Sequence, residues 1–151
     1  VVRLLPDSLI QSLLVQGEDA KQVLISRHRE NVLKGKSSFL VGLASFAEGL
    51  DLPGNLCRHV IIAKIPFAVP DDPIDQTVAE FLETQGRNPF YEMSLPDAAL
   101  KLVQACGRLI RNEHDYGQIT LLDSRILTKS YGKLLLNTLP PYRRKIGSGI
   151  T

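Results

Sequence analysis

The chain has 151 residues, enough for one domain with a sizeable hydrophobic core. Apolar residues make up 44% and charged residues 23%, which is ordinary for a soluble globular protein. The 18 Lys and Arg nearly balance the 16 Asp and Glu, which excludes binding to nucleic acid through bulk charge. Any such binding must come from local basic patches.

No apolar run approaches the roughly 18 residues of a membrane-spanning helix. No signal peptide is visible, because the short apolar start is followed at once by Pro6 and Asp7. We therefore expect a cytoplasmic protein without a membrane partner. The chain begins without Met, in the middle of an element, so we expect a fragment of a longer protein.

In the first half, strands are predicted on either side of a helix. Asp19 is expected to cap a helix that runs to about Lys34 and ends at Gly35. Three apolar runs are typical of buried strands: residues 13–16, 38–42 and 59–67. The last run is continuous, which suits a parallel sheet covered on both faces.

In the second half, Asp72 and Pro73 are expected to start a helix that ends at Gly86. Four apolar side chains of this helix share one face: Ile74, Val78, Phe81 and Leu82. A helix from about residue 94, a strand and a last helix follow, the latter two at residues 118–122 and 131–139. This alternation predicts an α/β, three-layer domain over residues 1–141, with a mostly parallel sheet flanked by helices. The basic, Gly- and Ser-rich residues 142–151 are expected to form a flexible tail.

Residues 98–112 are predicted to form one amphipathic helix. Opposite its apolar face, a polar stripe recurs at i, i+3, i+4 and i+7: Gln104, Gly107, Arg108 and Arg111. A glycine inside a helix costs about 1 kcal/mol, which is understandable if a ligand approaches the backbone closely there. Two arginines one turn apart suit a phosphate. The alternative is an ordinary solvated face.

The sequence Gly35-Lys36-Ser37 invites a comparison with a phosphate-binding loop, which we reject. Such a loop needs a glycine where Glu30 stands, and it follows a strand, whereas this stretch precedes one. Lys36 is expected to be an exposed charge before the strand.

The stretch SFAEGLDLPG, residues 45–54 and called the acidic loop below, follows a predicted strand. Functional sites of parallel sheets gather at such carboxyl ends. Glu48 and Asp51 place two carboxylates three residues apart, and Gly49 allows a tight turn. The loop is an acidic turn, a metal site, an acid–base pair, or a loop that hydrogen-bonds a sugar and a phosphate backbone. The metal site is weak because no third ligand is near; His59 is expected to be a partly buried core or edge residue.

The acidic loop followed by QACGRLIR resembles motifs V and VI of the superfamily 2 helicases, in the form typical of the DinG-type and XPD-like branch. DSRILTKSYGK, residues 123–133, resembles the branch's segment after the final core strand. The similarity covers nearly the whole chain and implies the second, C-terminal RecA-like motor domain. The chain departs from the pattern at Ala47, where relatives often carry a bulky aromatic, and at its start, where the first strand is missing or kept only as residues 1–5.

In that family, ATP binds with Mg²⁺ in a cleft between two RecA-like domains, of which this chain matches only the second. The resemblance implies that Arg108 and Arg111 are the phosphate-sensing and finger arginines. Gln104 would help to place the attacking water or the γ-phosphate, and Gly107 would permit close approach. The phosphate loop and the acidic Mg²⁺ box belong to the first domain, so the resemblance implies no metal site in this chain.

The resemblance also implies roles for residues of the acidic loop. Asp51 and Gly49 would face the nucleotide sugar, and Glu48 would couple the loop to the arginine helix. Ser45 and Phe46 would lie near the backbone of single-stranded DNA.

Members of the branch that this chain resembles often carry an iron–sulfur cluster, held by cysteines of the first motor domain. Cys57 and Cys106 are not those ligands; their apolar context indicates reduced core residues. Asp123 and Arg125 are expected to brace the arginine helix.

The implied function is an ATP-dependent DNA helicase in the full-length protein, with a part in DNA repair, while this chain alone is expected to be inactive. The alternative is a noncatalytic nucleic-acid or protein-binding module that keeps the fold. A phosphate loop and a DEAH-like acidic box upstream would favour the enzyme, and their absence the module.

Overall fold

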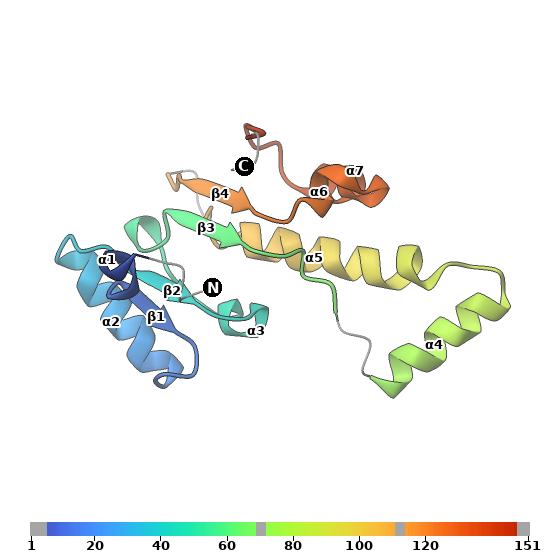
Figure 1. Ribbon diagram of the computed structural model, residues 1–151, viewed down its shortest axis with the longest axis horizontal. Helices are drawn as coiled ribbons and strands as arrows, with labels where there is room; N and C mark the ends of the chain where they lie inside the picture. Colours follow the sequence, from blue (N-terminus) through green and yellow to red (C-terminus); the bar gives the residue numbers. More distant parts are fainter. Residues whose placement is uncertain (1–5, 69–71, 111–113, 148–151) are drawn as a thin grey trace. The chain divides into compact units, whose positions relative to one another are not determined.

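The computed structural model describes residues 6–68, 72–110 and 114–147 (Figure 1). The described residues combine helices with two small sheets, one of β1 and β2 and the other of β3 and β4, which confirms the α/β class. The chain divides into two compact units. The first comprises residues 1–60 and 107–119, and the second comprises residues 61–106 and 120–151. No helix within the described ranges is long and apolar enough to cross a membrane.

The first unit is built around a parallel strand pair. After α1 (Asp7–Ile10), β1 (Leu13–Val15) pairs with β2 (Phe39–Val41) in parallel, as predicted. Helix α2 (Lys21–Leu33) connects the two strands and packs along both (Figure 1). A parallel connection of this kind requires a crossover, which the helix supplies. Gly35 follows the helix with φ 68°, so the predicted glycine stop is confirmed.

The predicted start of α2 is wrong in its detail. Ala20 occupies the capping position without a side-chain hydrogen bond. Asp19 instead accepts a 2.6 Å ion pair from Arg27, two turns into the helix. The aspartate therefore fixes a side chain on the helix surface instead of the first backbone amides.

The core of the first unit lies where α2 meets the acidic loop. Its buried members are Leu24, Phe46, Leu50 and Leu52. Partly buried side chains pack around them: Leu14, Ile25, Leu40, Ala47, Leu56 and Cys57. Three of the four buried residues come from the loop and the short helix α3 (Ala44–Ala47). The acidic loop is thus anchored through its apolar residues.

Strands β3 (His59–Ile62) and β4 (Gln118–Leu121) form the second pair. Gln118 N donates to Arg58 O at 2.9 Å, and Leu122 N donates to Ile62 O at 3.0 Å. Both strands advance by four residues between these bonds, so the pair is parallel. The predicted strand over 59–67 is shorter than expected and is not covered on both faces, because Ile61 is 51% exposed. His59 is exposed, not partly buried.

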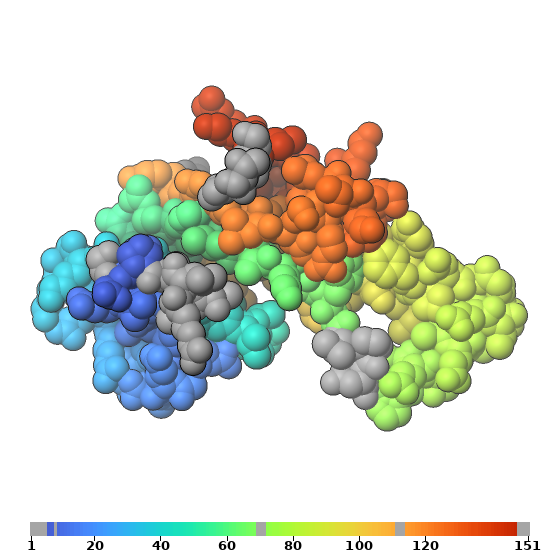
Figure 2. Space-filling view, in the orientation of Figure 1, coloured from blue at the N-terminus to red at the C-terminus, as the bar shows by residue number. Residues whose placement is uncertain are grey.

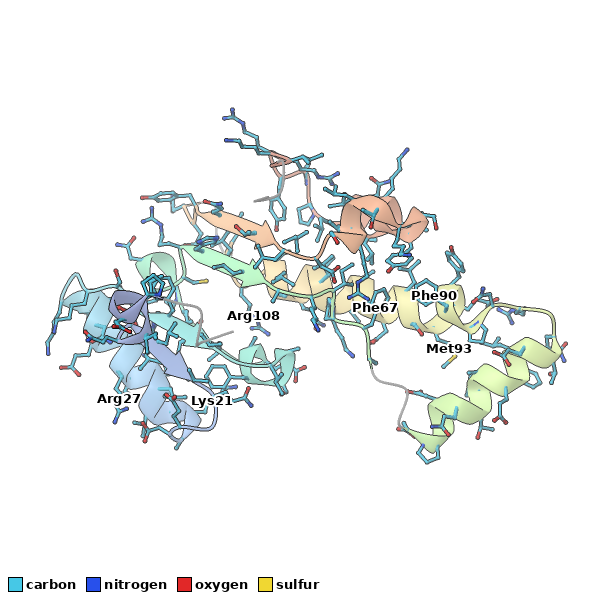
Figure 3. All side chains as sticks on the ribbon, in the orientation of Figure 1. Lys21, Arg27, Phe67, Phe90, Met93 and Arg108 are labelled. Atoms are coloured by element: carbon cyan, nitrogen blue, oxygen red, sulfur yellow. The ribbon has the colours of Figure 1, made fainter. Side chains whose placement is uncertain are left out.

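In the second unit, α4 (Pro73–Thr84) begins as predicted, with Asp72 Oδ1 accepting from Ile74 N at 2.8 Å. A π-helical turn η3 (Phe90–Ser94) leads into α5 (Leu95–Cys106). Two further helices, α6 (Arg125–Thr128) and α7 (Ser130–Thr138), follow β4. Aromatic rings connect the segment after β3 with η3 and α7. Phe67 lies 5.5 Å from Phe90, and both are labelled in Figure 3. Phe67 also lies 5.6 Å from Tyr131, measured between ring centroids.

The predicted apolar face of α4 is not buried. Ile74 is 71% exposed and Phe81 is 61% exposed, whereas Leu82 is buried. The helix, yellow-green in the space-filling view, presents much of its surface to solvent (Figure 2). The periodicity predicted the helix correctly, and most of the apolar face that it defines is exposed.

Candidate functional site

The acidic loop follows β2 directly, as the sequence predicted. Phe46 is only 6% exposed and fixes α3 in the core of the first unit. A Cβ atom on Gly42 would come within 2.7 Å of Phe46 Cδ1, so glycine at this position lets α3 lie close to the end of β2. Because the Phe46 side chain is buried, any contact with nucleic acid at this position would use the backbone or the exposed neighbour Ser45.

The polar residues of the loop lie on its outer side. Ser45, Glu48, Gly49 and Asp51 are all exposed. Gly49 has φ 71°, a conformation that favours glycine, and nothing lies within 4 Å of the position where a Cβ would stand. The loop therefore turns at Gly49 and leaves open space beside its backbone.

Basic side chains hold the carbonyl oxygens of this loop. Lys21 Nζ donates to Glu48 O at 2.5 Å and lies 5.5 Å from the centre of the Phe46 ring. Arg29 Nη2 donates to Asp51 O at 3.0 Å. Both donors come from α2, on which Figure 3 labels Lys21. The helix thus contacts the loop through main-chain acceptors and not through the carboxylates.

A third basic side chain reaches the loop from far along the chain. Arg108 Nη1 donates to Leu50 O at 3.5 Å, at the long end of hydrogen-bond range. Arg108 is half-buried, and 58 residues separate it from Leu50. The structure therefore brings one of the two predicted arginines to the acidic loop, which sequence spacing alone does not show.

The predicted arginine helix is wrong in extent. Helix α5 ends at Cys106, and residues 107–109 form a turn. Gln104 is exposed on α5 in the second unit, whereas Gly107 and Arg108 belong to the first unit. Gly107 is therefore not inside a helix but just after one, a position where glycine is common. Arg111 lies outside the described residues.

Asp123 and Arg125 form a separate pair in the second unit. The guanidinium donates to the carboxylate through Nε at 2.9 Å and Nη2 at 2.6 Å, while Ile65 N donates to Asp123 Oδ2 at 2.9 Å. Hydrogen bonding from Arg125 lowers the pKa of the Asp123 carboxyl, and the Ile65 amide adds to this shift. Arg125 also lies 5.6 Å from the Phe67 ring. The pair thus holds the segment after β3, whereas we predicted that it would brace the arginine helix.

Neither cysteine is part of a disulfide. Cys106 is fully buried, and burial raises the pKa of its thiol to about 11. Burial also raises the pKa of the half-buried Cys57 thiol, with a contribution from Asp115. Among the described residues, no group of three or more His, Cys, Asp or Glu side chains could hold a metal ion.

Sequence reasoning missed Lys21 and Arg29, which hold the loop. In the described residues, Arg108 donates to Leu50 O, and the predicted role of Glu48 in coupling the loop to the arginine segment stays a prediction. A signal for the two missed residues was present. Five positions of α2 fall on one helical face, and they combine an apolar centre with basic ends: Lys21, Leu24, Ile25, His28 and Arg29.

Comparisons with known proteins identify the family to which this chain belongs. Residues 2–142 match the family model of the helicase C-terminal domain, and the chain belongs to this family. It is 51% identical over 134 residues to the ATP-dependent DNA helicase DinG of Photobacterium profundum, which covers 89% of this chain and 19% of that protein. The ATP-dependent DNA helicase DinG of Escherichia coli K12 is 48% identical over 130 residues, 86% of this chain and 18% of that protein.

These findings support a DinG-type helicase C-terminal domain, as the motifs indicated. The chain spans about a fifth of the length of the curated relatives that it matches. The activity of the whole protein is therefore a proposal.

Proposed function

We propose that this chain is the second motor domain of an ATP-dependent DNA helicase that closes on ATP bound mainly by a first motor domain. Arg108 and Arg111 act on the γ-phosphate, where charge develops during phosphoryl transfer. Gln104 helps to place the attacking water, and Gly107 leaves room for the nucleotide. The first motor domain holds Mg²⁺.

The observation that carries the proposal is the contact between Arg108 and the acidic loop. Arg108 Nη1 bonds to Leu50 O, between the exposed residues Gly49 and Asp51. One end of the loop and the arginine segment therefore form a single surface within the first unit. Such a surface can present a guanidinium to a phosphate while the Asp51 carboxylate accepts hydrogen bonds from ribose hydroxyl groups.

The other end of the same loop is proposed to contact single-stranded DNA. Ser45 is exposed and offers a hydroxyl donor, and the Phe46 backbone lies beside it. Contacts of this kind recognise phosphates and carry no sequence information. Binding is expected to be indifferent to sequence and to weaken steeply with salt.

The test compares the 151-residue chain with the complete gene product that contains it, called the full-length protein below. The full-length protein should hydrolyse ATP faster when single-stranded DNA is added, and the isolated chain should show no turnover. Phosphate release measured with and without DNA decides this. DNA-stimulated turnover by the isolated chain would show that the site is complete without a second domain and would contradict the proposal.

The full-length sequence separates this function from a noncatalytic binding module. A phosphate loop and an acidic Mg²⁺ box before this chain would supply the groups that the proposal assigns to the first domain. A full-length protein that binds DNA but lacks both motifs and all ATP turnover would favour the module.

A further inference from the structure

One face of α2 donates hydrogen bonds to main-chain carbonyl groups along the acidic loop and the turn after it. Lys21 binds the carbonyl of Glu48, and Arg29 binds that of Asp51. His28 Nε2 lies 2.8 Å from the carbonyl of Leu56, at the end of η2 (Gly54–Leu56). These three side chains, called the α2 donors below, reach acceptors 22 to 28 residues further along the chain.

The helix geometry explains how one element serves all three acceptors. Positions 21, 28 and 29 of an α-helix fall within an arc of about 100°. Leu24 lies between them on the same face and is 1% exposed in the core that the loop also fills. Apolar packing therefore sets the distance between helix and loop, and the donors at either end of the face fix the loop's conformation.

His28 is the buried member of the set, with 5% exposure. A carbonyl oxygen can only accept, so Nε2 carries the proton in the bond to Leu56 O. Nδ1 lies 3.0 Å from Ser38 Oγ, just before β2. His28 thus ties the residue before β2 to the turn after the acidic loop, and the loop between them is held at both ends.

Two other cations, Arg27 in α2 and Lys34 just after it, behave differently, which makes the pattern informative. Arg27 pairs with the Asp19 carboxylate, and Lys34 pairs with the Glu30 carboxylate. Lys21 and Arg29 could have met the carboxylates of Glu48 and Asp51, but they bond to the carbonyl oxygens of these residues. A loop held by its backbone keeps its shape whatever its side chains bind.

We infer that Lys21 and Arg29 are positioning residues of the nucleotide and DNA site, acting through the backbone of the acidic loop with His28 as the buried anchor. The inference rests on the proposed function of the loop. Arg29 sets the part of the loop at Asp51, which is proposed to face the nucleotide sugar. Lys21 binds the carbonyl of Glu48 and so sets the part that carries Ser45 and Phe46, which are proposed to lie near DNA. Neither residue touches the reacting atoms.

We expect substitutions at the two ends of the acidic loop to change different kinetic constants. Arg29→Ala in the full-length protein should raise the KM for ATP about tenfold and change kcat little, because sugar contacts act equally in the ground and transition states. Lys21→Ala should raise the DNA concentration that gives half-maximal stimulation, with a smaller effect on the KM for ATP. Arg29→Lys should restore part of the ATP affinity, since it keeps a cationic donor.

A second readout reports the loop without any catalysis. Hydrogen–deuterium exchange of peptides covering residues 44–52 should speed up about tenfold in Arg29→Ala and Lys21→Ala. Exchange in the peptide that covers β1 should stay unchanged. Arg27→Ala and Lys34→Ala are the matched controls, because they remove an arginine of α2 and the lysine that follows the helix without touching the loop.

The outcomes separate the inference from the proposed function. The positioning role is supported if loop exchange speeds up in both variants, Arg29→Ala mainly raises the KM for ATP, and Lys21→Ala mainly raises the DNA concentration for half-maximal stimulation. Unchanged loop exchange in both α2 variants overturns it, whatever the turnover, and so does faster exchange with normal KM and DNA dependence. The proposed function fails instead if the unsubstituted full-length protein shows no DNA-stimulated ATP hydrolysis, and the exchange data then still decide whether α2 holds the loop.

Discussion

Two regions of the molecule combine aspartate with arginine, and they use these residues in opposite ways. In the second unit, the Asp123 side chain is 8% exposed, and its carboxylate accepts from Arg125 and from the Ile65 amide. In the first unit, Asp51 is exposed, and Arg29 bonds to its carbonyl oxygen. In the first arrangement an arginine holds the carboxylate, and in the second an arginine holds the main chain.

The proposed function makes this difference informative, because it assigns stability to the Asp123 pair and binding to the acidic loop. A buried carboxylate must be compensated by hydrogen bonds, because desolvation of an unpaired charge is costly. The exposed side chains of Glu48 and Asp51 carry no such penalty. We therefore expect substitutions in the two regions to separate cleanly between stability and activity.

Substitutions of the arginines should show the largest difference between effects on stability and effects on activity. In the full-length protein, Arg111→Ala is expected to lower kcat for ATP by roughly 10³-fold while ATP and DNA binding persist, as for other arginine fingers. Arg111→Lys should restore little, because an ammonium lacks the planar fork. Arg125→Ala should instead lower the unfolding temperature and leave the turnover of the folded protein unchanged. Steady-state ATPase assays beside thermal melts measure both effects, and a melted Arg111→Ala variant whose folded fraction is fully active would reverse the assignment.

One glycine in each region is expected to differ in the steric cost of an added methyl group. A Cβ on Gly132 in α7 would stand 2.1 Å from Ile126 O, so Gly132→Ala should cost about 3 kcal/mol in the free energy of unfolding. Gly49 has open space around it, and Gly49→Ala should cost only about 1 kcal/mol, from its positive φ. Gly49→Ala should nevertheless weaken ATP binding. Urea unfolding of both variants tests the order, which equal stability losses would contradict.

The aspartates form a matched pair. Asp123→Asn should destabilise the second unit by about 2 kcal/mol, because it weakens charge-assisted bonds to Arg125 and to the Ile65 amide. Asp51→Asn should leave stability nearly unchanged and raise the KM for ATP. If Asp51→Asn unfolds the chain as easily as Asp123→Asn does, the acidic loop is a structural element and not a ligand site.

The smallest effect is the pH dependence of the Asp123 contribution. The folded-state pKa of Asp123 lies below its ordinary value, so its stabilising effect is present above about pH 4 and is lost as the pH falls towards the folded-state pKa. The stability gap between the unsubstituted chain and Asp123→Asn should therefore narrow below about pH 4. Unfolding midpoints of the unsubstituted chain and of Asp123→Asn, measured at several pH values, test this. A gap that stays constant down to pH 2 would contradict the role of Arg125.

Much of the fold could be predicted because its signals are local. Asp72 and Pro73 start α4 as expected, since a capping carboxylate needs only the amide two residues ahead. Gly35 and Gly86 follow their helices with positive φ, which is a property of single residues. The motif order likewise indicated the family that the comparisons support.

The errors arose where a pattern within one element was used to predict its surroundings. Strand β3 is exposed at Ile61, because a continuous apolar run does not show that other elements cover both faces of the sheet. The continuous polar stripe on residues 98–112 is interrupted because α5 ends at Cys106. The roles of Gln104, Arg111, Ser45 and the other site residues stay predictions.

The sequence by itself determined that α2 and α4 form and that glycines follow them, because those signals depend on neighbours a few positions away. Its motifs in order also indicated the family. Only the tertiary structure decided that Arg108 meets Leu50, that Arg29 meets Asp51 and that Asp123 meets Ile65. These contacts join residues 22 to 58 positions apart. The packing of separate elements selects such partners, and no local periodicity encodes which carbonyl oxygen a long basic side chain will reach.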